Sequence, residues 1–542
     1  MSISHREDDP KTYNQKYEDN GHLDDAVVVV SNPLSQPIPW QHAFYKRLKL
    51  FPWWLRYNVG IAEEAVLKDK IIQLGTSIGL QDKWINSLLR HAVSEFSKKG
   101  LGSDYYGYHN IDHELEAAYI TLLAVNNNNA VNSEVNNNSN IYTELIQDDL
   151  KYLFVAALFH DYDPLKQFDK PHEDSVEWFL RSDKKIKRFI DDIEINIDIV
   201  IAIIHRTAYP FRGKIAEHAK KRMQELFTRA GIPKSETLKR EHYERLGWFL
   251  SVSERIAGYA LGNFERAMEL ARRNAHALGW HPSLINEESV KYFSALKEEK
   301  EMFEYVLDGL PEIYRKNLFN NIQAFREAWQ QEIDIRNSIR ANKITLVPVV
   351  EKRIDDNKDD YQQSLVCSIL DIYTQLPAPI RIKEQKFRSM LSDSHTILIT
   401  LRINDNSGEI VGYAKGGPLE NYQLRRGTHD WNLGKNNTAY MEYMSIKPGY
   451  WGATGGHLLR IEFLKQAKHR GYTFVTSYVH RHVILHRINE GEDIEIVQKY
   501  DPDKLDYYRI DLRKLVIHTV VPQSKVVEAD PGLGEKSIPV IE

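Results

Sequence analysis

Two histidines lie four residues apart in the segment YYGYHNIDHELEAAY, which covers residues 105–119. Residues four apart on a helix share one face, so this spacing predicts that the rings of His109 and His113 project side by side. Asn110 directly follows the first of them. Two imidazoles on one face are typical of metal binding or of proton transfer. The partners for either chemistry must come from other parts of the chain.

Further histidines and carboxylates follow in the same half of the sequence, in the order His160, Asp161, Asp163, His172, Glu173, His205 and Glu254. Neutral imidazole with carboxylate is the ligand set that suits zinc, iron, manganese or nickel. Asp161 and Glu254 are expected in apolar helices, where an unpaired charge is costly and a bound cation would compensate it. The ordered set predicts a metal site, although His172 or His205 alone is more typical of an ordinary surface or core histidine.

The elements that carry these residues are predicted to be helices. Between residue 60 and about residue 338 apolar residues recur at three-to-four spacing, as in the stretches 84–100, 148–163, 172–183, 197–210 and 245–279. Asparagine favours caps and turns over helix interiors. The Asn-rich stretch 126–140 is therefore predicted to be a flexible loop between two helices.

The order of these residues resembles the HD superfamily of metal-dependent phosphohydrolases, which have an all-helical fold. YHNIDH is similar to the Tyr-His-Asn-x-x-His signature of its cyclic nucleotide phosphodiesterase branch, and HDYDP is similar to that branch's His-Asp-x-Asp-His-Pro. The resemblance covers about residues 60–310. It implies that His109 is the general acid, that Asn110 orients it, and that the first-metal ligands are His113, His160, Asp161 and Glu254.

The sequence departs from this family pattern in three respects. Glu254 stands where the family has aspartate, and Pro164 follows Asp163 where a histidine is expected. No stretch matches the glutamine with which the family holds a purine, so a cyclic nucleotide is not implied as the substrate. Asp163, His172 and His205 are expected to hold a second metal or to contact a phosphate.

The reaction implied by this set is hydrolysis of a small phosphate ester or nucleotide. A divalent ion (Zn, Mn, Mg or Fe) lowers the pKa of bound water from about 15.7 towards about 7 and polarises the phosphoryl oxygen. Proton donation from His109 to the leaving oxygen typically contributes a factor of about 10²–10⁴. Some HD-fold relatives instead use two irons for oxygenation, and the sequence leaves this alternative open.

From about residue 343 the sequence has a different pattern. Segments rich in β-branched and aromatic residues predict strands within 343–351, 395–405, 409–420, 438–448, 474–480 and 506–513. Helical patterns lie at 360–376 and 455–471. The sequence thus predicts a multidomain protein, with an all-α domain over 39–338, an α+β domain over 343–520, and tails at 1–38 and 521–542.

Residues 440–480 predict a strand, a glycine-containing turn, an amphipathic helix and a second strand. A turn of small residues at a helix start aims backbone N–H groups at a phosphate. In this order the segment resembles the GNAT acetyltransferases, in which that turn holds the pyrophosphate of acetyl-CoA. The stretch LHRINEGEDIEIV is similar to the last helix and strand of that family. The resemblance implies that the turn residues that contact acetyl-CoA are Gly452, Ala453, Thr454, Gly455 and Gly456.

Other residues of this domain also have counterparts in the GNAT family. Trp451 and Thr454 replace the usual basic or amide residue and the usual central glycine of the turn. Glu442 lies on the preceding strand, where many relatives keep a general base, and His486 lies near the place of a tyrosine general acid. An exposed carboxylate and an ordinary histidine are the alternatives. The second substrate implied by the resemblance is an acyl-acceptor amine.

Composition restricts the other classes of function. The chain has 542 residues, enough for about two to four domains. A net charge of -5 gives no electrostatic case for nucleic-acid binding. Cys367 is the single cysteine, which excludes an internal disulfide framework and a cysteine metal cage. Residues 1–25 lack a signal-peptide pattern, and no run approaches the ~20 apolar residues of a membrane span, so we predict a cytoplasmic protein.

Three functions follow as hypotheses from the sequence. The first is a metal-dependent phosphohydrolase whose second domain acetylates a partner or senses acetyl-CoA. The second is an acetyltransferase regulated by a ligand or metal in the helical domain. The third is a binding module without activity.

Overall fold

The computed structural model describes residues 61–103, 105–134, 147–163, 172–278, 282–352, 354, 360–376, 381–442, 444–451, 453–500 and 505–515. The tails predicted at 1–38 and 521–542, part of the Asn-rich stretch, and Gly452 lie outside the described residues.

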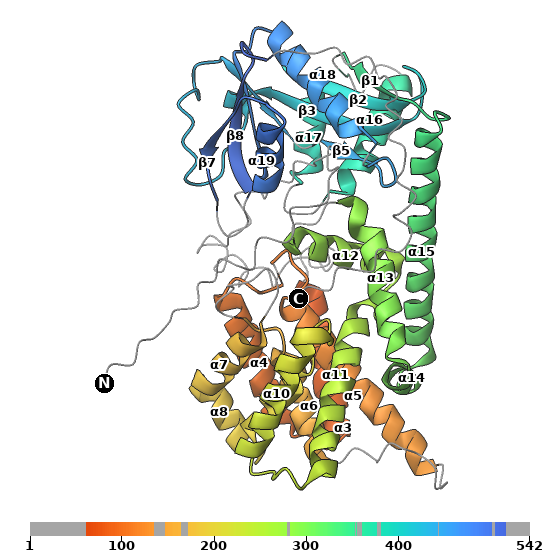
Figure 1. The fold of residues 1–542 in the computed structure, drawn as a ribbon, viewed down its shortest axis with the longest axis vertical. Coiled ribbons are helices and arrows are strands. Elements are labelled where there is room, and N and C mark those ends of the chain that lie inside the picture. The colour runs from red at the N-terminus through yellow and green to blue at the C-terminus, as the bar shows by residue number, and fades with distance from the viewer. Residues whose placement is uncertain are drawn as a thin grey trace, which may run out of the picture.

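The first half of the chain is built from helices (Figure 1). They are α3 (Ile61–Ser77), α4 (Asp82–Lys98), α5 (Ile111–Glu134), α6 (Gln147–Phe159), α7 (Glu173–Ser182), α8 (Lys184–Asp191), α9 (Ile197–His205), α10 (Gly213–Arg229), α11 (Thr237–Ala260), α12 (Phe264–Leu278), α13 (Ile285–Glu298), α14 (Lys300–Asp308) and α15 (Glu312–Arg340). A short 3-10 helix, η4 (Pro282–Leu284), precedes α13. The three-to-four apolar spacing therefore predicted the type of these elements correctly.

The loop predicted for the Asn-rich stretch is wrong over its first part, because α5 continues to Glu134. Contacts with other elements compensate for the low helix propensity of asparagine. Asn127 Nδ2 donates to the carbonyl of Gly309 at 2.9 Å, and Asn128 Nδ2 donates to the carbonyl of Tyr305 at 3.0 Å. These asparagines join α5 to α14, which no local pattern predicts.

The centre of the helical half consists of α5, α6, α9 and α11, which pack against one another. Their apolar side chains belong to one continuous core. The side chains of α9 are buried from Ile199 to His205, because its sequence is apolar on all sides. This core fixes the backbone beside His113, His160 and Glu254.

The second half of the chain contains a mixed sheet of eight strands. The strands are β1 (Leu346–Val350), β2 (Ile397–Ile403), β3 (Ile410–Pro418), β4 (Thr438–Met441), β5 (Ser445–Ile446), β6 (Phe474–His480), β7 (Ile494–Gln498) and β8 (Leu505–Asp511). Their order is β1-β2-β3-β4-β6-β8-β7, and β5 pairs with β3. The pair β4 and β6 is parallel, with Ala439 opposite Val475, whereas the other pairs are antiparallel.

Helices cover this sheet on both faces. α18 (Gly455–His469) packs on β1, β2 and β3, in a core that includes Ile399 and Phe463. α16 (Asp360–Thr374) and α17 (Glu384–Leu391) share a second core with Leu398 and Tyr413. α19 (Arg481–Asn489) contacts β6, β7 and β8. β2 is accordingly buried on both faces, from Ile397 to Arg402, and its two polar residues, Thr400 and Arg402, both lie close to Glu351.

The long helix α15 runs from the helical half to the side of the sheet half (Figure 1). The loop before Trp451 packs its backbone against this helix. Gly449 has a φ of 88°, and a Cβ there would lie 2.8 Å from Ile335 Cδ1 and 3.3 Å from the Cα of Glu332. A glycine is needed here both for the left-handed backbone and for the close approach.

We expect Gly449→Ala to lower the free energy of unfolding more than Gly471→Ala does. Both glycines have a positive φ, but nothing lies within 4 Å of a Cβ at Gly471. Gly471→Ala therefore carries only the left-handed backbone cost of about 1–2 kcal/mol. Gly449→Ala adds a steric conflict with α15, of about 1–3 kcal/mol. Urea unfolding of the two variants measures the difference, and equal losses of stability would show that this contact contributes nothing.

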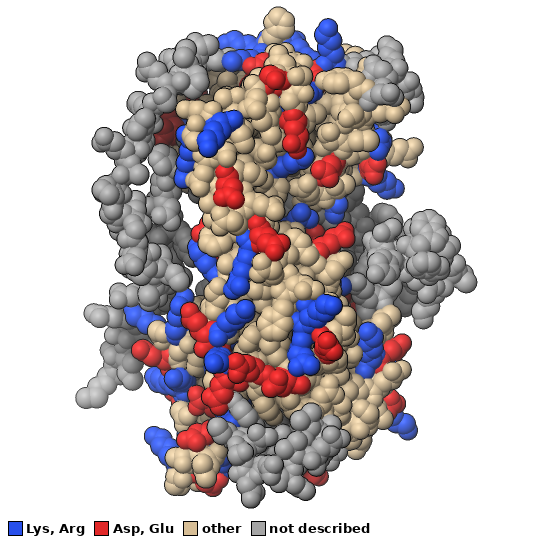
Figure 2. Space-filling view, turned by 90° about the vertical axis from the view of Figure 1, so that its right-hand side faces the viewer, with Lys and Arg blue, Asp and Glu red and all other residues tan. Residues whose placement is uncertain are grey.

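The surface carries charges of both signs. Figure 2 shows Lys and Arg interspersed with Asp and Glu over one face, in keeping with the small net charge of -5. Among the described residues, no helix combines the length and the apolar character that crossing a membrane requires.

Candidate functional site

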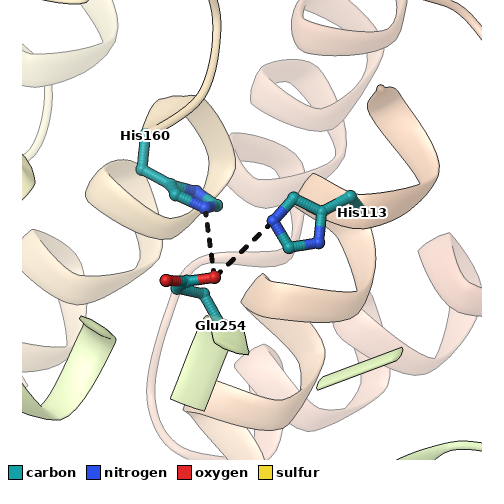
Figure 3. A group of neighbouring side chains, drawn as sticks. All are labelled: His113, His160 and Glu254. Atoms are coloured by element: carbon teal, nitrogen blue, oxygen red, sulfur yellow. Dashed lines mark ion pairs between the residues drawn. The ribbon is translucent and has the colours of Figure 1, made fainter. Parts of the chain in front are cut away.

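Four residues predicted as metal ligands converge where α5, α6 and α11 meet. His113 Nε2 lies 3.3 Å from Asp161 Oδ2 and 3.7 Å from Glu254 Oε2. His160 Nε2 lies 3.3 Å from the same oxygen of Asp161 and 4.0 Å from the same oxygen of Glu254. Figure 3 shows the rings of His113 and His160 facing the same oxygen of Glu254.

Three of these residues, His113, His160 and Glu254, offer ligand atoms that all lie within 4.8 Å of one another, a spacing that suits a divalent cation. His113 Nε2 and His160 Nε2 are buried and have no hydrogen-bond partner among the described residues. Ligand atoms about 2.1 Å from a tetrahedral cation lie about 3.4 Å from one another. The distances between these rings and carboxylates are 3.3, 3.3, 3.7 and 4.0 Å. Ring nitrogens and carboxylate oxygens are also the donor set of zinc, manganese and iron sites.

The pKa values of the group are shifted by burial and by the neighbouring charges. Burial raises the pKa of Glu254 to about 8, with His160 opposing this rise and Asp161 adding to it. Burial lowers the pKa of His113. Burial also acts to lower the pKa of His160, but Asp161 and Glu114 raise it well above its ordinary value. A cation at the centre would favour ionised carboxylates and neutral rings together.

His109 lies at the edge of this group. Its Nε2 is 3.7 Å from Asp161 Oδ2, and its side chain is 24% exposed. Asn110, which the family resemblance implies as the residue that orients His109, lies at the start of α5. Its Oδ1 accepts a hydrogen bond from the His113 N–H at 3.2 Å, and its Nδ2 donates to the Tyr105 carbonyl at 3.2 Å. Asn110 therefore caps the first turn of α5 and fixes the ligand His113.

Sequence reasoning missed Glu114, the residue after His113. Its carboxylate is fully buried. Oε2 lies 2.9 Å from His160 Nδ1, and Oε1 accepts a hydrogen bond from the Asp161 N–H at 3.2 Å. The sequence contained one sign of this residue, because Glu114 is an acid that directly follows a predicted ligand at the start of an apolar helix.

Three further predicted residues do not join the four ligands. Asp163 is buried, and its Oδ1 accepts a hydrogen bond from Ser175 Oγ at 2.5 Å. His172 is the N-cap of α7, where its Nδ1 accepts from the Asp174 N–H. His205 Nε2 faces Glu177 Oε2 at 3.4 Å.

His205 lies in a network of charged side chains around Glu177. Glu177 already accepts hydrogen bonds from Arg222 at 2.6 Å and from Arg181 at 2.7 Å. The pKa of Glu177 is held well below its ordinary value by His205, Arg222 and Arg181, against the opposing effect of burial. The same arginines also pair with Asp198 at 2.6 Å and with Glu225 at 2.8 Å. His205, Glu177 and Asp174 offer ligand atoms close enough together to hold a metal ion, so the second site stays a prediction. His205 belongs to a buried ion-pair network.

The predicted acetyl-CoA turn lies at the start of α18. Thr454 is the N-cap residue and has a φ of 64°, a left-handed conformation that is uncommon for a β-branched residue. A Cβ on Gly455 would lie 2.7 Å from Leu401 Cδ2, so glycine lets the helix start close to β2. Ala453 precedes this start and Gly456 follows it. The first N–H groups of a helix can in general donate hydrogen bonds to an anion.

Glu442, the predicted general base, is held by two side chains of the sheet half. Lys415 Nζ contacts Glu442 Oε1, and Tyr422 OH donates to the same oxygen at 2.7 Å. Lys415 is fully buried; burial lowers its pKa, and Glu442 opposes this change. The carboxylate of Glu442 thus compensates the buried positive charge of Lys415. His486 lies on α19 and is partly exposed.

We expect Glu442→Gln to destabilise the protein by about 3 kcal/mol, because the ammonium of Lys415 would stay buried without its carboxylate. The double variant Glu442→Gln with Lys415→Met should regain most of this loss, since an apolar replacement of a buried pair is often neutral. Urea unfolding of both proteins tests this. A Glu442→Gln variant as stable as the wild type would show that the pair is energetically unimportant.

No family model and no curated protein matches this chain. Solved structures similar to part of it include Tetrahymena GCN5, an acetyltransferase of the GNAT family from Staphylococcus aureus Mu50, and a GCN5-related N-acetyltransferase from Kribbella flavida. The identities are 10%, 13% and 13%, and the TM-scores are 0.23, 0.22 and 0.23. The matches cover 32%, 31% and 32% of this chain and 99% of each of those chains.

Proposed function

We propose that the helical half is a metal-dependent phosphohydrolase acting on a small phosphate ester or nucleotide. The observation that carries this proposal is the convergence of two buried, unpartnered imidazole nitrogens on the carboxylates of Asp161 and Glu254. The residues that would hold the cation are His113, His160, Asp161 and Glu254. When bound, a divalent cation polarises a phosphoryl oxygen and makes a water molecule more acidic.

His109 is the proposed proton donor. Its Nε2 lies within 3.7 Å of Asp161 Oδ2 and its ring is partly exposed, so it can reach both the ligand group and an incoming substrate. When protonated, the ring would give its Nε2 proton to the leaving oxygen. Asp161 would thereby serve as a ligand and as the partner of the acid.

Aromatic side chains shield the proposed site from bulk water. The Tyr108 ring lies 4.4 Å from the His113 ring and stacks on Tyr259 at 6.5 Å. Tyr292 extends this group, with its hydroxyl donating to the Arg255 carbonyl at 3.0 Å. Such a wall lowers the local dielectric constant and strengthens the interactions of the site with a phosphate.

Metal content tests this proposal directly. We expect the full-length protein, purified without chelator, to contain at least one equivalent of a divalent metal by mass spectrometry. Protein loaded with the metal identified in this way should then hydrolyse at least one compound from a panel of phosphomonoesters, nucleotides and cyclic nucleotides. No metal after reconstitution would refute the proposal, and two irons without hydrolysis would favour the HD-fold oxygenase alternative.

A second candidate function is acetyl transfer from acetyl-CoA to an amine by the sheet half. The observation that favours it is the turn at Ala453–Gly456, where a strained Thr454 precedes a helix start made of two glycines. Strained backbone at a helix start is a frequent feature of ligand sites. Calorimetric titration of the full chain with acetyl-CoA tests this function. The absence of binding would contradict it.

A further inference from the structure

We propose that Glu114 is a positioning residue, which uses one carboxylate to fix both His160 and Asp161 for the metal. This inference rests on the proposed metal-dependent function of the helical half. Glu114 follows the ligand His113 on α5, whereas the His160–Asp161 pair follows the end of α6. The carboxylate therefore links the two elements that must meet at the cation.

The geometry gives each oxygen of Glu114 a separate task. Oε1 accepts a hydrogen bond from the Asp161 N–H at 3.2 Å. Oε2 lies 2.9 Å from His160 Nδ1, which also lies 3.0 Å from the carbonyl of Ala157. With a cation bound, these two oxygens would favour the proton on Nδ1 and leave Nε2, which lies 3.3 Å from Asp161 Oδ2, as the nitrogen that faces the cation.

Position in the chain explains why such support is needed. α6 ends at Phe159, so the backbone of His160 and Asp161 lies beyond the regular helix. The Asp161 N–H donates to a side chain of α5 instead. Without Glu114, the two ligands would be held mainly by the turn in which they lie. A buried carboxylate beside a ligand imidazole also makes that imidazole a stronger donor.

A purely structural role for Glu114 predicts a different result from a positioning role. Loss of a buried carboxylate lowers stability in either case. Only a positioning residue changes the affinity for the cation and the protonation of the His160 ring in the folded protein. Outer-shell partners of this kind typically contribute a factor of about 10–100 in metal affinity.

The test compares Glu114→Gln with Glu116→Gln. Glu116 lies on the same helix and is similarly buried, and it pairs with Arg266. We measure the dissociation constants of Zn²⁺ and Mn²⁺ by chelator competition on full-length protein, urea unfolding, and the ¹⁵N shifts of the His160 ring. We expect Glu114→Gln to weaken metal binding about 10–100-fold and to alter the Nδ1–H signal, with little change in Glu116→Gln.

Each outcome decides a separate question. Equal metal affinity in Glu114→Gln and the wild type would overturn the inference and leave the proposed function intact. Equal weakening in both variants would also overturn it, because the loss would then follow from any buried charge on α5. No metal bound by the wild type would refute the proposed function itself. If Glu114→Gln does not fold, Glu114→Asp keeps the charge but shortens the reach, and wild-type affinity in that variant would overturn the inference.

Discussion

Asp161→Asn is expected to remove the bound metal and abolish hydrolysis while leaving the fold intact. Asp161 Oδ2 lies 3.3 Å from Nε2 of both His113 and His160, so it is the oxygen shared by the two rings. The amide has nearly the same shape but no negative charge. Loss of outer-shell support already costs a factor of about 10–100 in metal affinity, so loss of a ligand should cost at least about 100-fold.

Mass spectrometry of the purified proteins and chelator competition measure this effect. Asp149→Asn is the matched control, because Asp149 is also a buried aspartate of the α6 region and pairs with His242 at 2.8 Å, away from the ligand group. Urea unfolding separates loss of metal from loss of fold. Asp161→Asn protein that keeps its metal would place the cation elsewhere and remove the basis of the proposed function.

His109→Ala should lower turnover about 10²- to 10⁴-fold without releasing the metal. The ring contacts Asp161 at 3.7 Å and is partly exposed, whereas the proposed ligands His113 and His160 are buried. The loss of turnover should depend on the leaving group of the substrate. An ester with an alkoxide leaving group needs the proton, but a nitrophenolate ester does not, so the variant should retain much more activity on the second.

Turnover on the two esters, with metal content measured on the same samples, tests the role of His109. His242→Ala is a suitable control, since its side chain is 31% exposed and belongs to a separate ion pair. Equal losses on both esters would contradict a proton-donor role. Loss of metal in His109→Ala would instead make this residue a ligand.

The sequence alone determined the type of most elements and the residues of the candidate site. Three-to-four apolar spacing predicted helices such as α6 and α9, and β-branched segments predicted β2, β3 and β6. Such patterns are local, and each element can be predicted without knowing what it packs against. The resemblance to the HD superfamily implied His113, His160, Asp161 and Glu254 as a set, and the structure places these residues near one another.

The tertiary structure decided how those residues are partnered. Asn127 and Asn128 lie in a helix because α14 supplies carbonyl acceptors. His205 faces Glu177, to which α7 and α10 also bring arginines, rather than Asp161 or Glu254. Glu114 could not be assigned from the sequence, because its role depends on where α6 ends relative to α5. These outcomes rest on contacts between residues far apart in the chain, whose distances no local pattern contains.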